Sequence, residues 1–513
     1  MLEKFLTPMQ AILLSAVIIC SQAAFKFIEE SDTYFIMNLG RYILEHGIPH
    51  VDPFTIHENL HLVAQQWLSG VIFWEAYKNF GVDGLLTVDF IFGTALLIMH
   101  WRLCLFVSGG NKAVSFALTF VTALLVTPEI IPRPQIFSTP LLLGEVFLLE
   151  KFTRTQNFKF LLPLPILSVV LINLHAAVWL MMLVICLPFL FVRSERHAKF
   201  LSAAMVGIVV GGLINPYGVE AMTYVLRSYG VELINNNIKE MFTPSAHDIF
   251  GKGFYLMAAA LIISLAKFKV PWRYIFLSGG LTYLAIMHER NAILFYLIAT
   301  FPIAYAWREF TPPKILAEGG AFLPMFFLLV FANTVMITTL LKNDLGKLSL
   351  PLEILLAAAI IVTAYNLLVS KFDGRLLHPK ILPRKNLWLF AAALTVGVIL
   401  FTTQNHDDGK VDGDFTAAMK VLLKSERPEN IRLYAGQGYG GAAGMLGVKY
   451  YIDSRAEVFL PENNGRANIF AEYLNFRAGF INYKDFFARY KFTHIFITNE
   501  EPFIFDLLTN DKN

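Results

Sequence analysis

The amino-acid sequence predicts a polytopic α-helical membrane protein with a small α/β domain at its carboxyl end. Hydrophobic residues make up 56% of the 513 positions, charged residues make up 16%, and 46 residues are phenylalanine. Mean hydropathy is +0.55, whereas soluble domains contain about 25% charged residues. Apolar runs of about 15 to 22 residues, which suit a hydrocarbon core about 30 Å thick, recur up to residue 403. After that position the composition becomes mixed.

Roughly thirteen apolar runs are predicted to span the membrane. They cover residues 8–27, 84–107, 113–127, 136–150, 159–173, 176–192, 200–214, 252–267, 273–287, 291–307, 320–341, 350–370 and 386–403. Residues 1–403 are therefore expected to form one transmembrane domain, which includes a long outer loop at 28–83. The first run is interpreted as an uncleaved anchor rather than a signal peptide.

Lysine and arginine residues cluster in every second connection between these runs, and such connections face the cytoplasm. The basic connections are 151–159, 193–199, 267–273, 308–314 and 371–385. The amino terminus is then cytoplasmic, and residues 404–513 are extracytoplasmic. We expect a multi-pass protein of the inner (plasma) membrane.

The outer loop is predicted to contain two helices. Residues 33–46 carry apolar side chains at helical spacing, and Gly47 follows as a stop signal. An amphipathic helix lying on the membrane is expected there. Residues 66–80 form the second helix, whose Trp67 suits the membrane interface. The loop is interpreted as a lid over an outward cavity.

Glu30 and Asp32 form an acidic pair just beyond the first apolar run. Two carboxylates at this spacing could share a divalent cation such as Mg²⁺ or Mn²⁺, bind a phosphate through it, or supply a general base. The alternative is a solvated helix end without a chemical role.

Further polar residues fall in the connections that are predicted to face outward. They are Gln66, Trp67, Arg133, Gln135, His175, Asn215, His288 and Arg290. Any one of them could simply extend its polar end to the membrane surface. Each histidine could also be a structural residue that hydrogen-bonds to backbone. Together on one side, they predict a polar site.

Residues 404–414 read as a linker, and about a hundred residues of mixed composition follow. Helices are predicted at 415–423 and 483–490, and strands at 431–435, 450–453 and 494–498, which together indicate a compact α/β layer. The glycine-rich segment 436–441 lacks the spacing of a nucleotide-binding loop, so that interpretation is rejected.

Asp453, Arg455 and Glu457 follow the second predicted strand, at an edge where α/β sheets commonly bind ligands. They either recognise an acceptor or form an internal ion pair.

Composition argues against a disulfide framework, a cysteine metal cluster and a nucleic-acid partner. The three cysteines, Cys20, Cys104 and Cys186, lie in apolar stretches, which favours buried thiols over a disulfide framework or a metal cluster. A formal net charge of +3 without a basic tract gives no reason to expect a nucleic-acid partner.

A series of short motifs occurs in a characteristic order along most of the chain. They are residues 31–34, 40–44, 52–54, 66–69, 133–135, 173–175, 215–218 and 451–455. In this order, with the acidic pair and the extracytoplasmic domain, the chain resembles the GT-C superfamily of polyprenyl-phosphate-sugar-dependent glycosyltransferases, and in particular a group of poorly characterised bacterial members.

The resemblance implies a transferase that moves a sugar from a polyprenyl-phosphate-linked donor to an extracytoplasmic glycan, lipid or protein. Asp32 stands where such enzymes keep the catalytic carboxylate, and Glu30 where a second acid often helps with metal or acceptor. Arg133 and Arg290 would suit the phosphate. Gln66 and Trp67 depart from the acid-containing His-Glu-Trp of many relatives, which puts a second-acid role for this loop in doubt.

Two alternatives remain open. One is a non-catalytic scaffold or lipid-glycan binder that keeps the same frame. The other is a transporter or flippase, which is disfavoured because the sequence shows no repeated halves and because the polar residues lie at span ends rather than near the midplane.

Overall fold

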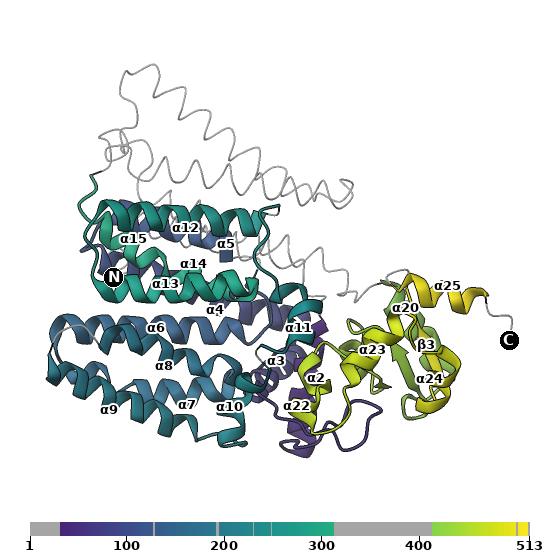
Figure 1. Ribbon diagram of the computed structural model, residues 1–513. Coiled ribbons are helices and arrows are strands. Elements are labelled where there is room, and N and C mark those ends of the chain that lie inside the picture. The colour runs from purple at the N-terminus through teal and green to yellow at the C-terminus, as the bar shows by residue number, and fades with distance from the viewer. Residues whose placement is uncertain are drawn as a thin grey trace, which may run out of the picture.

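A computed structural model describes residues 31–126, 129–190, 194–228, 230–247, 249–311, 413–498 and 501–510. Four predicted spans lie outside these residues, namely 8–27, 320–341, 350–370 and 386–403. Glu30 and most of the predicted linker at 404–414 also lie outside them. The described residues form a large helical region and a small C-terminal α/β domain (Figure 1).

The helical region consists of helices that run side by side, with the C-terminal domain at one end of the bundle (Figure 1). They are α4 (Val82–Val107), α5 (Lys112–Val126), α6 (Gln135–Thr155), α7 (Leu164–Leu174), α8 (Ala176–Leu190), α9 (Glu195–Gly212), α12 (Ile249–Lys267), α13 (Trp272–Met287), α14 (Ala292–Ile298) and α15 (Thr300–Ala306). Their bounds follow nine of the predicted apolar runs.

Two runs differ in detail from the prediction. The run at 291–307 is divided into α14 and α15, and α7 begins only after Pro163, because the chain before it forms a short 3₁₀ helix (Phe158–Phe160). Proline is accepted at a helix start but lacks the N–H needed in the interior.

One described helix, α4, is long and apolar enough to cross a membrane by length and composition. Shorter apolar helices cover Lys112–Ala123, Phe158–Leu174 and Ala176–Leu190. The count of thirteen spans therefore stays a prediction. At the end of the bundle away from the C-terminal domain, Arg273 donates to the buried carboxylate of Glu150 at 2.8 Å, which joins α13 to α6.

The outer loop contains both predicted helices, α2 (Ser31–His46) and α3 (Trp67–Phe80). Gly47 ends α2 at φ 86°, a conformation that glycine adopts without strain. The apolar face of α2 is not laid on a membrane as predicted, because Phe35, Ile36 and Leu39 are buried against α3 and the C-terminal domain. Protein packing replaces lipid on this face.

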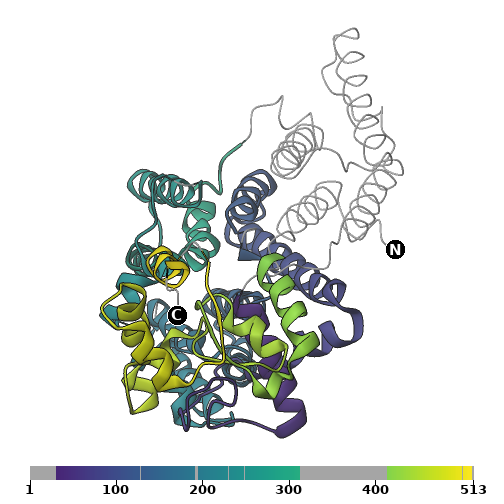
Figure 2. The same ribbon diagram turned by 90° about the vertical axis from the view of Figure 1, so that its right-hand side faces the viewer.

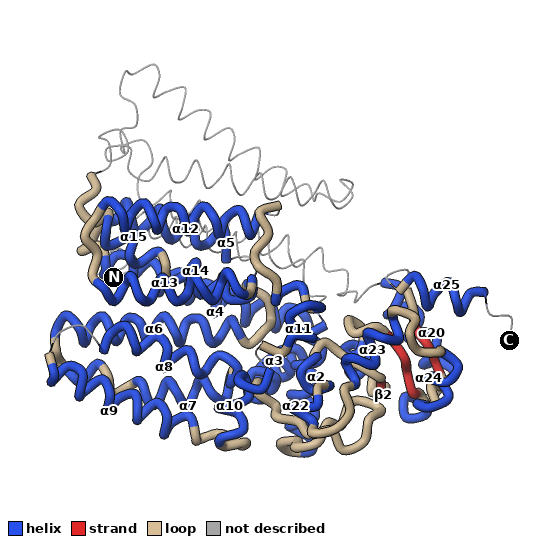
Figure 3. Tube along the Cα trace, in the orientation of Figure 1, coloured by secondary structure: helices blue, strands red, loops and turns tan. Residues whose placement is uncertain are grey.

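The C-terminal domain is built on a three-stranded parallel sheet with strand order β2-β1-β3. Its strands are β1 (Arg432–Ala435), β2 (Lys449–Tyr450) and β3 (His494–Phe496), and its helices are α20 (Gly413–Ser425), α21 (Gly440–Met445), α22 (Pro461–Asn464), α23 (Ile469–Arg477), α24 (Tyr483–Tyr490) and α25 (Pro502–Asn510). Among the described residues, strands occur only in this domain (Figure 3). The predicted α/β layer is confirmed, although β2 is shorter than the predicted strand at 450–453.

The C-terminal domain packs directly on α2, and Figure 2 shows green helices of this domain beside the purple segment that contains α2. Glycines make this contact close: a Cβ atom on Gly441 would lie 2.6 Å from the carbonyl oxygen of Ser31. Arg41 of α2 donates to the carbonyl oxygen of Met445 at 3.0 Å. The N–H of Ile56, in the outer loop, donates to the carbonyl oxygen of Tyr450 at 2.9 Å. The glycine-rich segment therefore serves domain packing.

Candidate functional site

Asp32, Arg133 and Glu240 form a row of ion pairs at the end of the bundle that carries the C-terminal domain. Asp32 lies in the first turn of α2, Arg133 in the loop before α6, and Glu240 in a short 3₁₀ helix, Lys239–Met241. Arg133 Nη2 lies 3.1 Å from Asp32 Oδ2, and Nη1 lies 2.9 Å from Glu240 Oε1. The Arg133 side chain is 11% exposed and that of Asp32 is 35% exposed. The row is thus anchored but still open to a ligand.

The start of α2 is fixed against the loop that carries Arg133. Thr33 is buried, and its hydroxyl donates to the carbonyl oxygen of Pro132 at 3.2 Å. Arg133 is itself placed by the sharp turn before α6, where its N–H donates to the carbonyl oxygen of Ile131 at 2.6 Å. These backbone contacts set the distance between Asp32 and Arg133.

Sequence reasoning missed two acids of this site, Glu129 and Glu240. Burial raises the pKa of Glu129, and the nearby charge of Glu240 adds to this effect while Arg133 opposes it. Burial also acts to raise the pKa of Glu240, but the charge of Arg133 outweighs it, so this pKa lies below its ordinary value. Glu129 precedes Arg133 in the same predicted outward connection, which could have identified it. Nothing local distinguishes Glu240.

Arg290 is exposed and its charge reaches the same acids. It acts to lower the pKa values of Glu129 and Glu240, and its Nη1 lies 4.0 Å from the sulfur of Met241. His288 is buried and its Nδ1 lies 2.8 Å from the carbonyl oxygen of Met241. The connection that carries His288 and Arg290 is therefore fixed beside the 3₁₀ helix of Glu240.

Gln135 is the first residue of α6, and His175 directly precedes α8. His175 is buried, and its Nδ1 lies 3.1 Å from the hydroxyl of Ser138. Burial and, as a smaller effect, the positive charge of Arg290 together lower the pKa of His175 to about 3. The imidazole is therefore neutral at physiological pH. Gln135 Oε1 is buried and has no hydrogen-bond partner within the described ranges.

Gln66 and Trp67 begin α3, and here the observed contacts are structural. Trp67 Nε1 donates to Asn173 Oδ1 at 2.9 Å, and Asn173 Nδ2 donates to the carbonyl oxygen of Ile214 at 2.8 Å. The carbonyl oxygen of Gln66 accepts from the N–H of Gly70 within α3. These bonds hold the outer loop against α7 and the turn after α9.

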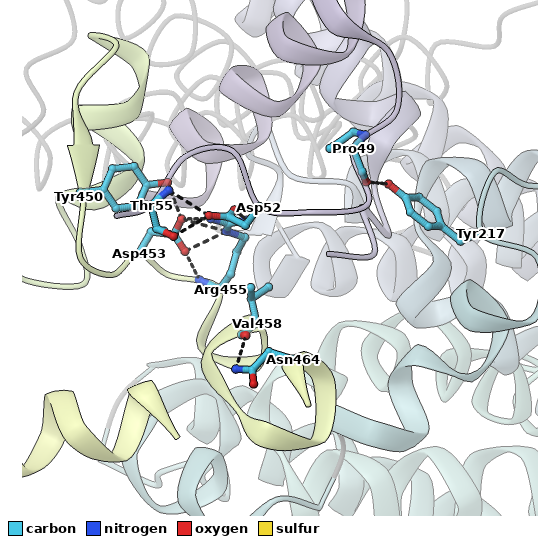
Figure 4. Close-up of polar contacts among 9 residues, drawn as sticks. All are labelled: Pro49, Asp52, Thr55, Tyr217, Tyr450, Asp453, Arg455, Val458 and Asn464. Carbon is cyan, nitrogen blue, oxygen red and sulfur yellow. Dashed lines mark hydrogen bonds and ion pairs between the residues drawn. The ribbon is translucent and has the colours of Figure 1, made fainter. Parts of the chain in front are cut away.

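Asn215 is occupied by its own turn. Its amide nitrogen donates to the carbonyl oxygens of Gly212 and Gly218 at 2.7 and 3.0 Å, and its amide oxygen accepts from the N–H of Tyr217 at 2.8 Å. The Tyr217 hydroxyl in turn donates to the carbonyl oxygen of Pro49 (Figure 4). The Asn215 side chain therefore shapes the connection that supports the outer loop.

Asp453 and Arg455 form the internal ion pair that sequence analysis gave as one of two alternatives. Arg455 Nη2 lies 2.6 Å from Asp453 Oδ2, and Nη1 lies 2.8 Å from Asp52 Oδ1 of the outer loop (Figure 4). All three side chains are buried. Thr55 donates to Asp52 and Tyr450 donates to Asp453, both at 2.7 Å. This cluster joins the C-terminal domain to the outer loop.

The charges within this cluster stabilise one another. Burial alone would raise the pKa of Asp52, but the charge of Arg455 and the bonds from Thr55 bring it below its ordinary value. The guanidinium carbon of Arg455 also lies 4.3 Å from the ring centre of Phe35 in α2. The Arg455 guanidinium therefore also packs against an aromatic ring of the helical region.

A cleft of about 970 Å³ opens between the helical region and the C-terminal domain. Helices α10 (Val219–Ser228) and α11 (Glu232–Asn237) form one wall, and α22 with the start of α23 forms the other. Its lining mixes apolar and polar groups, including Arg227, Asn236 and Glu462. Its shape therefore depends on how the C-terminal domain is docked.

The predicted metal site at Glu30 and Asp32 stays a prediction. Residues 31–126 and the other described ranges contain no group of three or more histidines, cysteines, aspartates or glutamates placed to hold a metal ion. Asp32 is paired with Arg133, and Glu30 lies outside the described residues.

No protein-family model matches the chain. No curated protein matches it either. Among solved structures, it is similar to the crystal structure of the Archaeoglobus fulgidus oligosaccharyltransferase in the apo form, with a TM-score of 0.43 and 11% sequence identity. The similarity covers 86% of this chain and 64% of that enzyme. At this level of similarity, function has to be argued from the residues of this chain.

Proposed function

We propose that the chain is a membrane glycosyltransferase that moves a sugar from a polyprenyl-phosphate-linked donor to an extracytoplasmic acceptor, with Asp32 as the catalytic carboxylate. The observation that carries this proposal is the partly exposed ion pair between Asp32 and Arg133, which continues to Glu240. Transfer from a phosphate requires a carboxylate for the acceptor and a cation for the leaving group in one place. This row supplies both.

Arg133 and Arg290 are assigned to the donor phosphate. A guanidinium offers five N–H groups in a fixed fork that matches phosphate oxygens. Arg133 is held by two carboxylates, and Arg290 is exposed and acts to lower the pKa of one of them, Glu240. Negative charge grows on the phosphate as the sugar leaves, so cations fixed beforehand favour the transition state over the bound donor.

In a single displacement, the acceptor oxygen forms a bond to the anomeric carbon while the bond from that carbon to the phosphate oxygen breaks. Polyprenyl phosphate leaves with the electron pair, and a carboxylate of the site receives the acceptor proton. Asp32 deprotonates or orients the acceptor. The product has inverted configuration at the anomeric carbon.

Neutral polar groups complete the proposed site. His175 and Gln135 offer hydrogen bonds to sugar hydroxyls, because His175 is uncharged and Gln135 Oε1 has no partner among the described residues. His288 positions the segment that carries Glu240 through its contact with Met241. A divalent cation at Glu30 and Asp32, if bound, would neutralise charge on the leaving phosphate.

The transporter alternative is less well supported. Arg133 precedes α6, His175 follows α7 and Arg290 follows α13, whereas transporters bind substrate near the bilayer midplane on interrupted helices. A scaffold or lipid-glycan binder could use the same residues without chemistry, and the exchange of Asp32 for asparagine separates these functions.

The test is mass spectrometry of surface glycans and glycoproteins in a deletion strain that is complemented with wild type or with Asp32→Asn. Loss of the product with normal protein amount and retained lipid binding supports the enzyme. Glu45→Gln is the matched control, because Glu45 is an exposed acid at the other end of the same helix. Unchanged product with Asp32→Asn would instead favour the scaffold.

A further inference from the structure

Glu457 is a carboxylate of the C-terminal domain that reaches the helical region. It lies in a 3₁₀ helix, Ala456–Phe459, directly after the buried Arg455. Gln65 Nε2 of the outer loop lies 3.3 Å from Glu457 Oε1, and Tyr224 of α10 is also hydrogen-bonded to the Glu457 carboxylate. Glu457 is thus positioned by groups from two other parts of the chain.

The surroundings of Glu457 differ from those of Asp32. Asp32 contacts a guanidinium at 3.1 Å, whereas Glu457 contacts two neutral donors and makes no ion pair within 4.0 Å among the described residues. Its charged neighbours act from a greater distance: Arg290 and Arg455 favour the carboxylate, and Asp32 opposes it. Burial is the largest influence and raises the pKa of Glu457.

An unpartnered polar atom, the amide oxygen of Gln65, lies beside this carboxylate. Gln65 holds Glu457 through its amide nitrogen, while its amide oxygen is buried and has no hydrogen-bond partner within the described part of the chain. Because buried polar groups are normally hydrogen-bonded, this amide oxygen is suited to a ligand that brings a hydroxyl group.

We propose that Glu457 is a second catalytic carboxylate, which receives the proton of the acceptor hydroxyl while Gln65 accepts a hydrogen bond from the same ligand. The inference rests on the proposed glycosyl transfer and refines it. As the acceptor oxygen bonds to the anomeric carbon and the bond to phosphate breaks, the hydroxyl proton passes to Glu457. Asp32 stays paired with Arg133 and orients the two substrates.

This division of roles follows from the two environments. Asp32 is engaged by its ion pair with Arg133, whereas a partly desolvated carboxylate among neutral donors accepts a proton more readily than one in water. The acceptor specificity would then lie partly in the C-terminal domain. The acceptor is expected to be a hydroxyl compound such as a glycan.

The experiment uses the full-length protein in the complemented deletion strain, and surface products are measured by mass spectrometry. Glu457→Gln keeps the shape and the bonds from Gln65 and Tyr224 but cannot accept the proton. We expect at least about a hundredfold less product per molecule of protein, which is the usual contribution of a general base. Glu457→Asp keeps a proton acceptor and should retain measurable product. Glu429→Gln, an exposed acid of the same domain, should match wild type.

Medium pH gives a readout that a structural role would not change. Since the site is proposed to face outward, product should fall in wild type and in Glu457→Asp as the medium is acidified through the pKa of this carboxyl. Wild-type product in Glu457→Gln would overturn the inference, and so would an Asp variant as inactive as the Gln variant. If Glu457→Gln does not accumulate, pH-independent product in Glu457→Asp overturns it.

The two proposals fail in different ways. Loss of product in Asp32→Asn with full product in Glu457→Gln leaves glycosyl transfer standing and removes only Glu457 from it. Full product in Asp32→Asn removes the proposed function itself, and with it the role of Glu457.

Discussion

Two clusters of this protein use the same chemistry, an arginine between two carboxylates, in different surroundings. Arg133 joins Asp32 to Glu240 where the side chains are 11%, 35% and 46% exposed. Arg455 joins Asp52 to Asp453 where the side chains are 5% exposed for arginine and fully buried for both acids. Burial decides what each cluster can do. In the proposed function the first exchanges a carboxylate for a ligand, whereas the second holds two regions of the fold together.

The largest effect on stability is expected for Arg455→Met. The substitution leaves Asp52 and Asp453 buried without a counter-charge, and breaking a buried pair costs about 3–5 kcal/mol. Thermal unfolding of the purified full-length protein should shift to clearly lower temperature, and protease should release the C-terminal domain more readily. Arg427→Met, at an exposed position of the same domain, is the control. An unchanged unfolding temperature would contradict the structural role of the buried cluster.

The opposite behaviour is expected for Arg133→Gln. Asp32 and Glu240 are partly exposed, so water can replace the lost cation and stability should change little. Surface product should fall about 100- to 1,000-fold, the usual effect of removing one donor to a developing negative charge. Lys239→Gln removes an exposed cation next to Glu240 and should keep full product. Large destabilisation with product retained would reverse the assignment of the two clusters.

A smaller effect is expected at the contact between α2 and α21. A Cβ atom on Gly441 would meet the carbonyl oxygen of Ser31 at 2.6 Å, and neither backbone can move freely. Overpacking of this kind costs about 1–3 kcal/mol. Gly441→Ala should therefore lower the unfolding temperature, whereas Gly438→Ala should not, because nothing lies within 4 Å of that position. Equal unfolding temperatures would argue against tight docking.

The smallest expected effect is the pH dependence of stability that comes from Asp52. The pKa of Asp52 lies below its ordinary value of 3.8 in the folded protein, so its stabilisation is complete above that value and is lost as the pH falls through the lower, folded-state pKa. Asp52→Asn should unfold at lower temperature than wild type at neutral pH. The difference should narrow below pH 3.8 as wild type loses the charge. A gap that is independent of pH would contradict the ion pair.

The helices could largely be predicted from sequence because their signals are local. The apolar run at 84–107 is matched by α4 at Val82–Val107, and Gly47 ends α2 where the stop signal predicted. The helix at 483–490 in the C-terminal domain was also predicted with its observed bounds. Where the prediction was wrong, for the membrane-facing role of α2, the apolar stripe was identified correctly but its partner was not. An amphipathic pattern shows that a face is buried without showing against what.

The site was only partly predictable. Asp32, Arg133 and Arg290 were selected because unusual polar residues between apolar runs are conspicuous, but the pairing of Arg133 with Glu240 joins residues 107 positions apart. Glu240 was missed because an acid in a polar connection has no distinguishing local pattern, whereas Glu129 could have been identified from its place in the same connection as Arg133. Sequence also left open whether Arg455 binds an acceptor or forms an internal ion pair. Its contact with Asp52, which lies 403 positions away in sequence, could not be inferred from local pattern.

By itself, the sequence determined which segments are helical and apolar, that an α/β segment follows the apolar runs, and which polar residues stand out between those runs, since each depends on composition and periodicity within a few turns of chain. Only the tertiary structure decided which charges meet and how much water reaches them. The energy of a charge depends on its surroundings in space, and the packing of α2 between α3 and the C-terminal domain creates those surroundings.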